Sequence, residues 1–387
     1  MHTLPITRGA LCLCASIAAI AAPPQALPLM PQVVASASQV FAQVTRSPQP
    51  EILRLDPALD AIIAPATKIE KVADTFQFTE GPMWREDRLW ISDVVGDKTY
   101  AVSADGAVQL LLDKSGGYPN PPAGSYLGPN AMVTDKDGTV LLAQQGGRKI
   151  VRIVRVGDHL ELRPFLSTFD GKRFNSPNDL VFAPDGSLWF TDPSYGLALG
   201  DKDPAKELPF NAVFRYADGK LTPVITNLTL PNGIGFSPDG KILYVSNSGP
   251  GMCVMRYDVH QNGSVSSGVK LIDYPHPIGR GVPDGLKVDT AGNIWSTGPG
   301  GIRIITPSGK VLGQIRLPQT AANLAFADHG RTAYITAQTT VYRIHILTPG
   351  ETALPVIKTL SRPLEWNPVR FSTELDAPTC RAPGSID

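Results

Sequence analysis

The chain has 387 residues, with 35 Lys and Arg against 35 Asp and Glu, so its formal charge at pH 7 is zero. A neutral chain without a cluster of basic residues lacks the electrostatic footprint of a nucleic-acid-binding protein. Gly and Pro number 36 each, while 42% of the residues are hydrophobic. This composition excludes a disordered chain and predicts a folded protein with many short strands joined by turns.

The N-terminal residues are typical of a secretory signal. Arg8 precedes a short apolar run over residues 9–22, with small residues suited to signal cleavage near its end. The run is too short to span a membrane, and no later segment has ~20 unbroken apolar residues. We expect a signal peptide at 1–22, a Pro-rich linker at 23–55, and a periplasmic or secreted mature protein. A buried N-terminal helix is the alternative.

Six segments repeat one pattern: an acidic residue or Asn, a short apolar strand, a turn, and a second strand. The steps between their starts are 50, 48, 54, 52 and 39 residues, and such regular spacing indicates a repeat array. Further strand-like stretches follow each pair, which predicts an all-β, six-bladed β-propeller over residues 56–348. The six segments begin at Glu80, Asn130, Asn178, Asn232, Asp284 and Asn323.

The sixth repeat offers only three strands, the last over residues 341–347. A strand-like segment at 68–73, upstream of the first repeat, supplies the missing fourth and would close the ring. A linear solenoid is the alternative architecture, and the short last repeat speaks against it. Acidic residues of the recurring turns, Asp137, Asp185 and Asp239, precede glycines and are expected to serve structure.

The residues that open the six innermost strands of a propeller arrive at one face around the central axis. Here every one carries a side-chain oxygen, with two carboxylates, several amides, and no His or thiolate among them. Such donors suit a hard cation such as Ca²⁺ better than Zn²⁺. The alternative is that Asn and Asp open strands because they favour turns. The pattern predicts one central metal site.

Five motifs occur in a specific order: EGP at 80–82, GKRFNSPNDLVFAPDGSLWFTDPSYGL at 171–197, PNGIGFSPDG at 231–240, LYVSNS at 243–248, and VPDGL at 282–286. Together they resemble the gluconolactonase branch of the SMP-30/gluconolactonase/luciferin-regenerating-enzyme family. The resemblance implies one divalent cation in the central tunnel, and family members accept Ca²⁺, Zn²⁺, Mg²⁺ or Mn²⁺. It assigns as ligands Glu80, Asn178, Asn232 and Asp284, leaving Asn130 facing substrate and Asn323 serving structure.

Such a cation would act as a Lewis acid on a lactone carbonyl, while a carboxylate beside it takes the proton of the attacking water. We expect Asp284 to be this base, with Glu80 as the alternative. Asp179 could instead point into its blade, and Arg173 could be an ordinary surface cation. A partial lid is expected at residues 114–128. The candidates for binding the substrate hydroxyls are Asn130, Arg173, Asp179 and Tyr195.

The sequence thus predicts a metal-dependent hydrolase that opens glucono-1,5-lactone to gluconate. One alternative is hydrolysis of another lactone or a phosphotriester at the same site. A second is a propeller that only binds a ligand, with a structural ion. The expected partner is a small lactone, and the pattern does not define an oligomeric state. The C-terminal extension, 349–387, has no blade pattern, and Cys253 and Cys380 could pair in an oxidising compartment.

Overall fold

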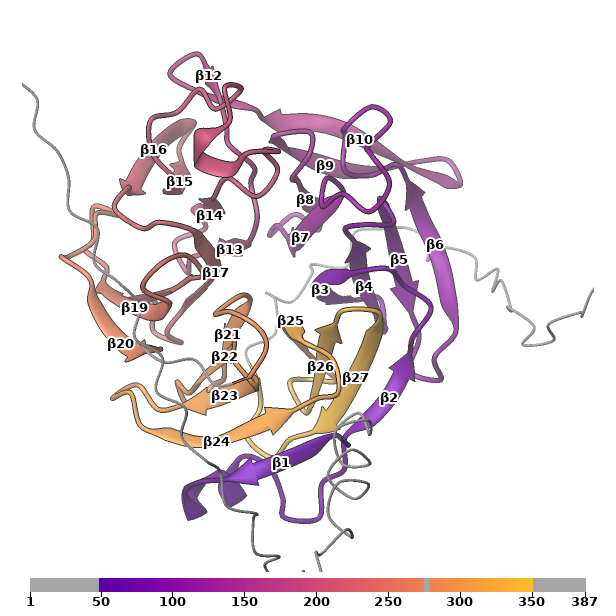
Figure 1. Ribbon diagram of the computed structural model, residues 1–387, viewed down its shortest axis with the longest axis vertical. Coiled ribbons are helices and arrows are strands. Elements are labelled where there is room, and N and C mark those ends of the chain that lie inside the picture. The colour runs from indigo at the N-terminus through magenta and orange to yellow at the C-terminus, as the bar shows by residue number, and fades with distance from the viewer. Residues whose placement is uncertain (1–48, 275–278, 351–387) are drawn as a thin grey trace, which may run out of the picture. The chain divides into compact units, whose positions relative to one another are not determined.

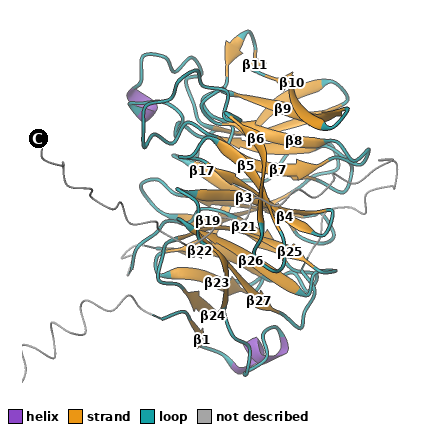
Figure 2. Cartoon of the chain, turned by 90° about the vertical axis from the view of Figure 1, so that its right-hand side faces the viewer, coloured by secondary structure: helices purple, strands orange, loops and turns teal. Residues whose placement is uncertain are grey.

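The computed structural model describes residues 49–274 and 279–350 (Figure 1). Within these residues the strands form six sheets of four or five strands around a central axis, and one further two-stranded hairpin. The predicted six-bladed β-propeller is confirmed. Seen from the side, the strands cross the middle of the ring and the loops gather at its two faces (Figure 2).

Four blades are built from consecutive antiparallel strands. Blade one contains β3 (Thr79–Arg85), β4 (Arg88–Asp93), β5 (Lys98–Val102) and β6 (Val108–Asp113). Blade two contains β7 (Pro129–Thr134), β8 (Val140–Gln144), β9 (Lys149–Val156) and β10 (His159–Leu166). Blade three contains β13 (Leu180–Phe182), β14 (Leu188–Asp192), β15 (Ala212–Ala217) and β16 (Lys220–Ile225). Blade four contains β17 (Pro231–Phe236), β18 (Ile242–Asn247), β19 (Cys253–Asp258) and β20 (Val269–Asp273).

The last two blades also take strands from the beginning of the described chain. Blade five contains β21 (Leu286–Val288), β22 (Ile294–Gly298), β23 (Gly301–Ile305), β24 (Val311–Arg316) and β1 (Glu51–Arg54). Blade six contains β25 (Ala321–Ala327), β26 (Thr332–Ala337), β27 (Thr340–His345) and β2 (Glu70–Ala73). The remaining short elements are the hairpin β11 (Thr168–Phe169) with β12 (Lys172–Arg173), and the 3₁₀ helices η1 (Pro57–Ala61) and η2 (Gly200–Lys202).

The strand expected at residues 68–73 is β2, which pairs antiparallel with β27, placing Glu70 opposite Arg343. The expected linker boundary at residue 55 is wrong, because β1 already pairs with β24, with Ile52 opposite Ile315. This pairing covers the edge of β24, whose N–H and C=O groups would otherwise lack partners. The described chain also extends past 348, where Gly350 forms a bridge with Asp289.

Several expectations lie outside the described residues, namely the signal peptide, most of the linker, and the C-terminal extension beyond residue 350. Cys253 is buried at the start of β19. Its pairing with Cys380, which belongs to the part of the chain without a description, stays a prediction.

Neighbouring blades pack through large buried side chains. Aromatic rings from adjacent blades meet at centroid distances of 5.3–5.6 Å, and such edge or stacked contacts add to the free energy of burying the rings. This packing fixes the angle between blades and so the positions of the inner strands β3, β7, β13, β17, β21 and β25. The interblade pairs are Trp84 with Tyr334, Trp189 with Phe236, and Trp295 with Phe326.

The recurring turns have the structural role expected of them. The carboxylate of Asp137 accepts a hydrogen bond from the amide of Thr139. The carboxylates of Asp185 and Asp239 likewise each accept a hydrogen bond from the amide two residues later in the chain. The glycine that follows each of these three residues has a φ between 69° and 85°, a conformation that glycine adopts without strain.

The last residue of the second strand anchors the entry into the inner strand in three blades. Asp93 accepts from the amide of Phe78, Asp192 from that of Ser176, and Asn247 from that of Leu230, at 2.8–2.9 Å. Each anchored amide lies two residues before a predicted metal ligand, namely Glu80, Asn178 and Asn232. The blade framework therefore holds the main chain of these three ligands directly.

Asp192→Ala should lower the free energy of unfolding by about 2–4 kcal/mol. Asp192 is fully buried and accepts the amides of both Asn175 and Ser176 at 2.8 Å, and each buried amide left without a partner costs ~1–3 kcal/mol. Asp192→Asn retains one acceptor oxygen and should lose about half as much. Urea unfolding measures the difference, and a loss below ~1 kcal/mol for the Ala variant would contradict this role.

Candidate metal centre and active site

The six oxygen-bearing residues come together where the inner strands begin, around the axis of Figure 1. Main-chain bonds connect consecutive blades there: the amide of Ala131 donates to Asn178 O at 3.1 Å, and the amide of Gly233 donates to Asp284 O at 3.0 Å. Five of the six are buried, and Asp284 keeps part of its surface exposed. We refer to this set as the ring.

Close approach of the inner strands explains the glycine that follows three of the predicted ligands. A Cβ on Gly81 would lie 2.3 Å from Asn130 O, and one on Gly233 would lie 2.3 Å from Asp284 O. At Gly285 it would lie 2.0 Å from the Asn323 side chain. At Gly81 and Gly233 a side chain would collide with backbone, and at Gly285 it would displace the Asn323 side chain, so the glycines allow the ring residues of neighbouring blades to meet.

The two ring carboxylates, Glu80 and Asp284, lie close enough for the charge of Glu80 to act on Asp284. Burial raises the pKa of Glu80 to about 7. Burial, together with the charge of Glu80, raises the pKa of Asp284 well above its ordinary value. Ionising two buried carboxylates that lie close together costs free energy, because their negative charges repel each other, unless a cation neutralises them. The pair is therefore suited to hold a divalent cation.

The ring amides that belong to the predicted ligand set have their nitrogens occupied by neighbours. Asn178 Nδ2 donates to Gln145 Oε1 at 3.4 Å, and Asn232 Nδ2 donates to Ser248 Oγ at 3.0 Å. This orientation leaves each Oδ1 available as a ligand. In the described part of the chain no three His, Cys, Asp or Glu side chains gather closely enough to hold a metal. A cation at the ring thus needs the amide oxygens, a donor set typical of Ca²⁺.

Asn323, expected to serve structure alone, contacts a predicted ligand. Its Nδ2 donates to Glu80 Oε2 at 3.0 Å, and the same carboxylate accepts the amide of Gly81 at 2.5 Å. The expectation for Asn323 was incomplete, because the sixth blade lies directly beside the first and brings the two side chains together. These bonds fix the orientation of the Glu80 carboxylate.

Gln145, which the sequence patterns did not single out, joins the ring to the expected lid. Its Oε1 accepts from Asn130 Nδ2 at 3.0 Å as well as from Asn178, and its Nε2 donates to Tyr126 O at 2.5 Å. Tyr126 belongs to the loop 114–128. The only signal in the sequence is a polar Gln pair that directly follows an apolar strand, which by itself indicates no role.

Gln145→Leu should weaken Ca²⁺ binding by about ten- to a hundredfold, the usual effect of removing a residue that orients a metal ligand. Leu cannot accept the bonds that orient Asn130 and Asn178, nor hold the loop through Tyr126. Calorimetric titration with Ca²⁺ measures the effect. Gln145→Glu keeps the acceptor oxygens and should bind Ca²⁺ at least as well as the original protein, so equal losses in both variants would contradict the assignment.

Of the four predicted substrate contacts, the structure brings two to the ring. Asn130 is a ring member, and the Tyr195 hydroxyl accepts a hydrogen bond from Asn232 Nδ2 at 3.4 Å. Burial raises the pKa of the Tyr195 phenol, so it stays protonated and can donate to a substrate. Arg173 lies elsewhere, exposed on β12, where its amide donates to Glu207 Oε2 at 2.7 Å.

Asp179, the fourth predicted contact, is buried and engaged with other blades. Its Oδ1 accepts the amide of Leu180 at 2.9 Å, and its Oδ2 accepts the amide of Ile234 at 3.3 Å. Oδ2 also lies 3.4 Å from the ammonium of Lys287. Substrate binding by Asp179 is therefore not supported, because both of its oxygens are bonded within the protein.

The loop at 114–128 lies beside the ring and carries aromatic side chains. Tyr126 packs edge-on against Phe78, with ring centroids 5.0 Å apart, and both Tyr118 and Tyr126 remain more than 40% exposed. The amide of Gly128 donates to Val94 O at 3.0 Å and ties the end of the loop to blade one. The loop therefore contacts the ring through Gln145, and its role as a partial lid stays a prediction.

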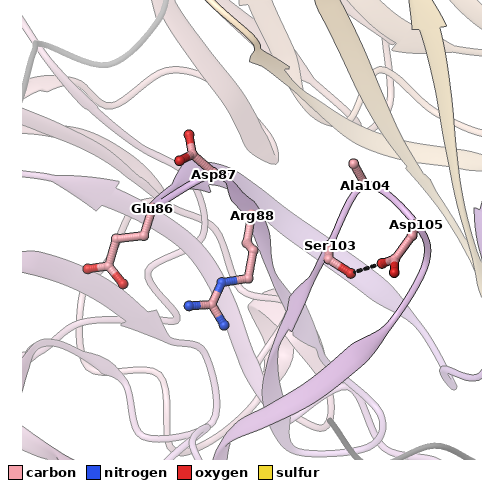
Figure 3. Close-up of a pocket in the computed structure, with 6 residues that line it drawn as sticks. All are labelled: Glu86, Asp87, Arg88, Ser103, Ala104 and Asp105. Carbon is pink, nitrogen blue, oxygen red and sulfur yellow. Dashed lines mark hydrogen bonds between the residues drawn. The ribbon is translucent and has the colours of Figure 1, made fainter. Parts of the chain in front are cut away.

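A separate surface hollow lies at the opposite end of β3 (Figure 3). It is lined by the β3–β4 and β5–β6 turns, from Glu86 to Arg88 and from Ser103 to Asp105. Glu86 is six residues beyond Glu80, about 20 Å along an extended strand. None of the ring residues contributes to this hollow.

A sequence model of the SMP-30/Gluconolactonase/LRE-like region matches residues 78–339. The chain belongs to this family. It is 35% identical over 347 residues to a gluconolactonase of Zymomonas mobilis, covering 86% of this chain and 96% of that one. It is 34% identical over 268 residues to a 6-deoxy-6-sulfogluconolactonase of Pseudomonas putida, covering 67% and 82%. A gluconolactonase structure from Xanthomonas campestris aligns with a TM-score of 0.66 at 29% identity, covering 76% and 94%.

The family predicted from the five motifs is thereby confirmed. The family match spans all six ring residues and the loop at 114–128. Within the described residues no helix is both long and apolar enough to cross a lipid bilayer.

Proposed function

We propose that this lactone hydrolase opens a sugar lactone, glucono-1,5-lactone to gluconate, at one divalent cation held by Glu80, Asn178, Asn232 and Asp284. Ca²⁺ fits the oxygen-only donor set best. The observation that carries the proposal is the proximity of the Glu80 and Asp284 carboxylates, each with a raised pKa, flanked by two amides whose nitrogens are already bonded.

The cation, when bound, supplies Lewis-acid polarisation of the lactone carbonyl. Residues of the chain hold the cation, take up the proton of the attacking water and bind the substrate. Glu80 is held by Gly81 and Asn323, which suits a fixed ligand. Asp284 is the less buried of the two carboxylate residues, so we assign to its carboxylate the task of taking the proton from the attacking water. We assign Asn130 and the Tyr195 hydroxyl to bond the hydroxyl groups of a sugar lactone, because Asn130 is a ring residue and Tyr195 contacts the ring residue Asn232.

A periplasmic or secreted site of action is part of the proposal. Its support is the signal-like segment at residues 1–22, which lies outside the described residues. The names of the relatives support a sugar lactone as the substrate class, since two of them are called gluconolactonase and one 6-deoxy-6-sulfogluconolactonase.

The deciding experiment follows glucono-1,5-lactone hydrolysis by the mature protein with a pH indicator and added Ca²⁺. EDTA should reduce turnover to the spontaneous rate, and added Ca²⁺ should restore it. The melting temperature is recorded in the same samples, so that loss of activity is separated from unfolding.

Two results would overturn the proposal. One is turnover that persists after exhaustive chelation, because it would remove the cation from the reaction. The other is Ca²⁺ binding without lactone turnover. In that case hydrolysis of a phosphotriester such as paraoxon, assayed in parallel, would reassign the reaction, and its absence would leave a ligand-binding propeller.

A further inference from the structure

Lys287 places a positive charge next to the ring, where it contacts Asn323. It belongs to β21 in blade five, three residues after Asp284, and its side chain is 27% exposed. Its Nζ lies 3.4 Å from Asp179 Oδ2 in blade three and 3.3 Å from Asn323 Oδ1 in blade six. It also donates to Leu286 O at 3.0 Å. Three blades therefore hold this ammonium in one place.

The ammonium reaches a predicted ligand through one side chain. Lys287 donates to the Oδ1 of Asn323, and this turns the Nδ2 of Asn323 toward Glu80 Oε2, 3.0 Å away. Lys287 also attracts the Glu80 carboxylate directly through its charge. Because the side chain is partly buried, water screens this charge less than it would at the surface.

The charged side chains around the ring have a net negative charge that one divalent cation would neutralise. The charged groups that act on the Glu80–Asp284 pair are Asp179 and Lys287. With all three carboxylates ionised, their charge of −3 and the +1 of Lys287 sum to −2. One divalent cation neutralises this set, whereas a trivalent cation of the same size would leave a net positive charge in a poorly solvated space.

We propose that Lys287 is a selectivity-determining residue, a fixed internal cation that matches the ring to divalent ions and disfavours trivalent ones. The inference rests on the metal centre of the proposed function. Removing the charge of Lys287 raises the affinity for any cation, and raises it more for a trivalent ion, because repulsion grows with the charge of the bound ion.

The test compares Ca²⁺ with La³⁺, two ions of similar size and different charge, by calorimetric titration of the full mature protein at pH 6.5. The measured quantity is the ratio of the two dissociation constants. In Lys287→Gln this ratio should shift toward La³⁺ by on the order of tenfold. Gln can still donate to Asn323, so the variant removes the charge while it keeps a hydrogen bond.

Three further variants separate charge from structure. Lys287→Met should shift the ratio as Lys287→Gln does, and Lys287→Arg should leave it unchanged because the charge is kept. Lys220→Gln, at an exposed lysine of β16, is the matched control and should also leave the ratio unchanged. Circular dichroism melting shows whether each variant is folded. If Lys287→Met does not fold, Lys287→Gln alone tests the effect of removing the charge.

An unchanged ratio in a folded Lys287→Gln variant would overturn the inference, and so would an equal shift in Lys287→Arg. Either result leaves the lactonase proposal intact, because lactone turnover is not part of the measurement. An original protein that binds neither ion would overturn the metal centre itself and this inference with it.

Discussion

Glu80→Gln should reduce hydrolysis of glucono-1,5-lactone by on the order of a thousandfold and weaken Ca²⁺ binding by on the order of a hundredfold or more. Glu80 is buried and bonded by Asn323 and Gly81, so its carboxylate has one orientation toward the ring. Gln has nearly the same shape but no negative charge. The variant therefore removes half of the ring's carboxylate charge while the inner strand keeps its packing.

The measurement pairs initial rates of lactone hydrolysis with calorimetric Ca²⁺ titration. Glu86→Gln is the matched control. Glu86 directly follows β3, the strand that carries Glu80, and it lines the hollow of Figure 3 at the far end of that strand. The control should match the original protein in both quantities. Full activity in the Glu80 variant would remove this residue from the metal centre.

Asp284→Asn should lower kcat by about a hundred- to ten-thousandfold, the usual contribution of a general base, while part of the Ca²⁺ affinity remains. The Asn side chain still offers an oxygen to the cation but cannot accept the proton of the attacking water. Burial and the adjacent Glu80 raise the pKa of Asp284 in the cation-free ring, and a bound cation would oppose this shift by stabilising the ionised carboxylate.

This pattern differs from the one expected for Glu80, and the comparison assigns the base. Saturating Ca²⁺ should not restore turnover in the Asp284 variant, because the missing group takes part in the reaction and not only in binding. Recovery of normal kcat at high Ca²⁺ would show that Asp284 is a ligand only. The base would then be Glu80, and the fixed orientation of that carboxylate would need another explanation.

The ring could be found from the sequence because a propeller repeats. Glu80, Asn232 and Asp284 each open an inner strand and are each followed by glycine, and the structure shows why: a side chain at Gly81, Gly233 or Gly285 would collide with the neighbouring blade. Periodicity therefore reports both the fold and the positions that face the axis. These features depend on local sequence, repeated once per blade.

The contacts that orient the ring could not be found in this way. Lys287 bonds side chains of blades three and six, and Asn323 reaches Glu80 across 243 residues of sequence. Gln145 likewise serves two ring amides at once. Arg173 and Asp179 show the opposite case, since a motif suggested both as substrate contacts, whereas Arg173 lies exposed on the β11–β12 hairpin and the oxygens of Asp179 are bonded within and between blades.

The sequence by itself determined the all-β repeat, the family, and the residues that open the inner strands, because strand alternation, turn glycines and motif order are local properties of the chain. Only the tertiary structure decided which of these side chains contact each other and where the internal charge of Lys287 lies. Those contacts depend on the rotation of one blade against the next, which the interblade packing of residues such as Trp189 and Trp295 sets.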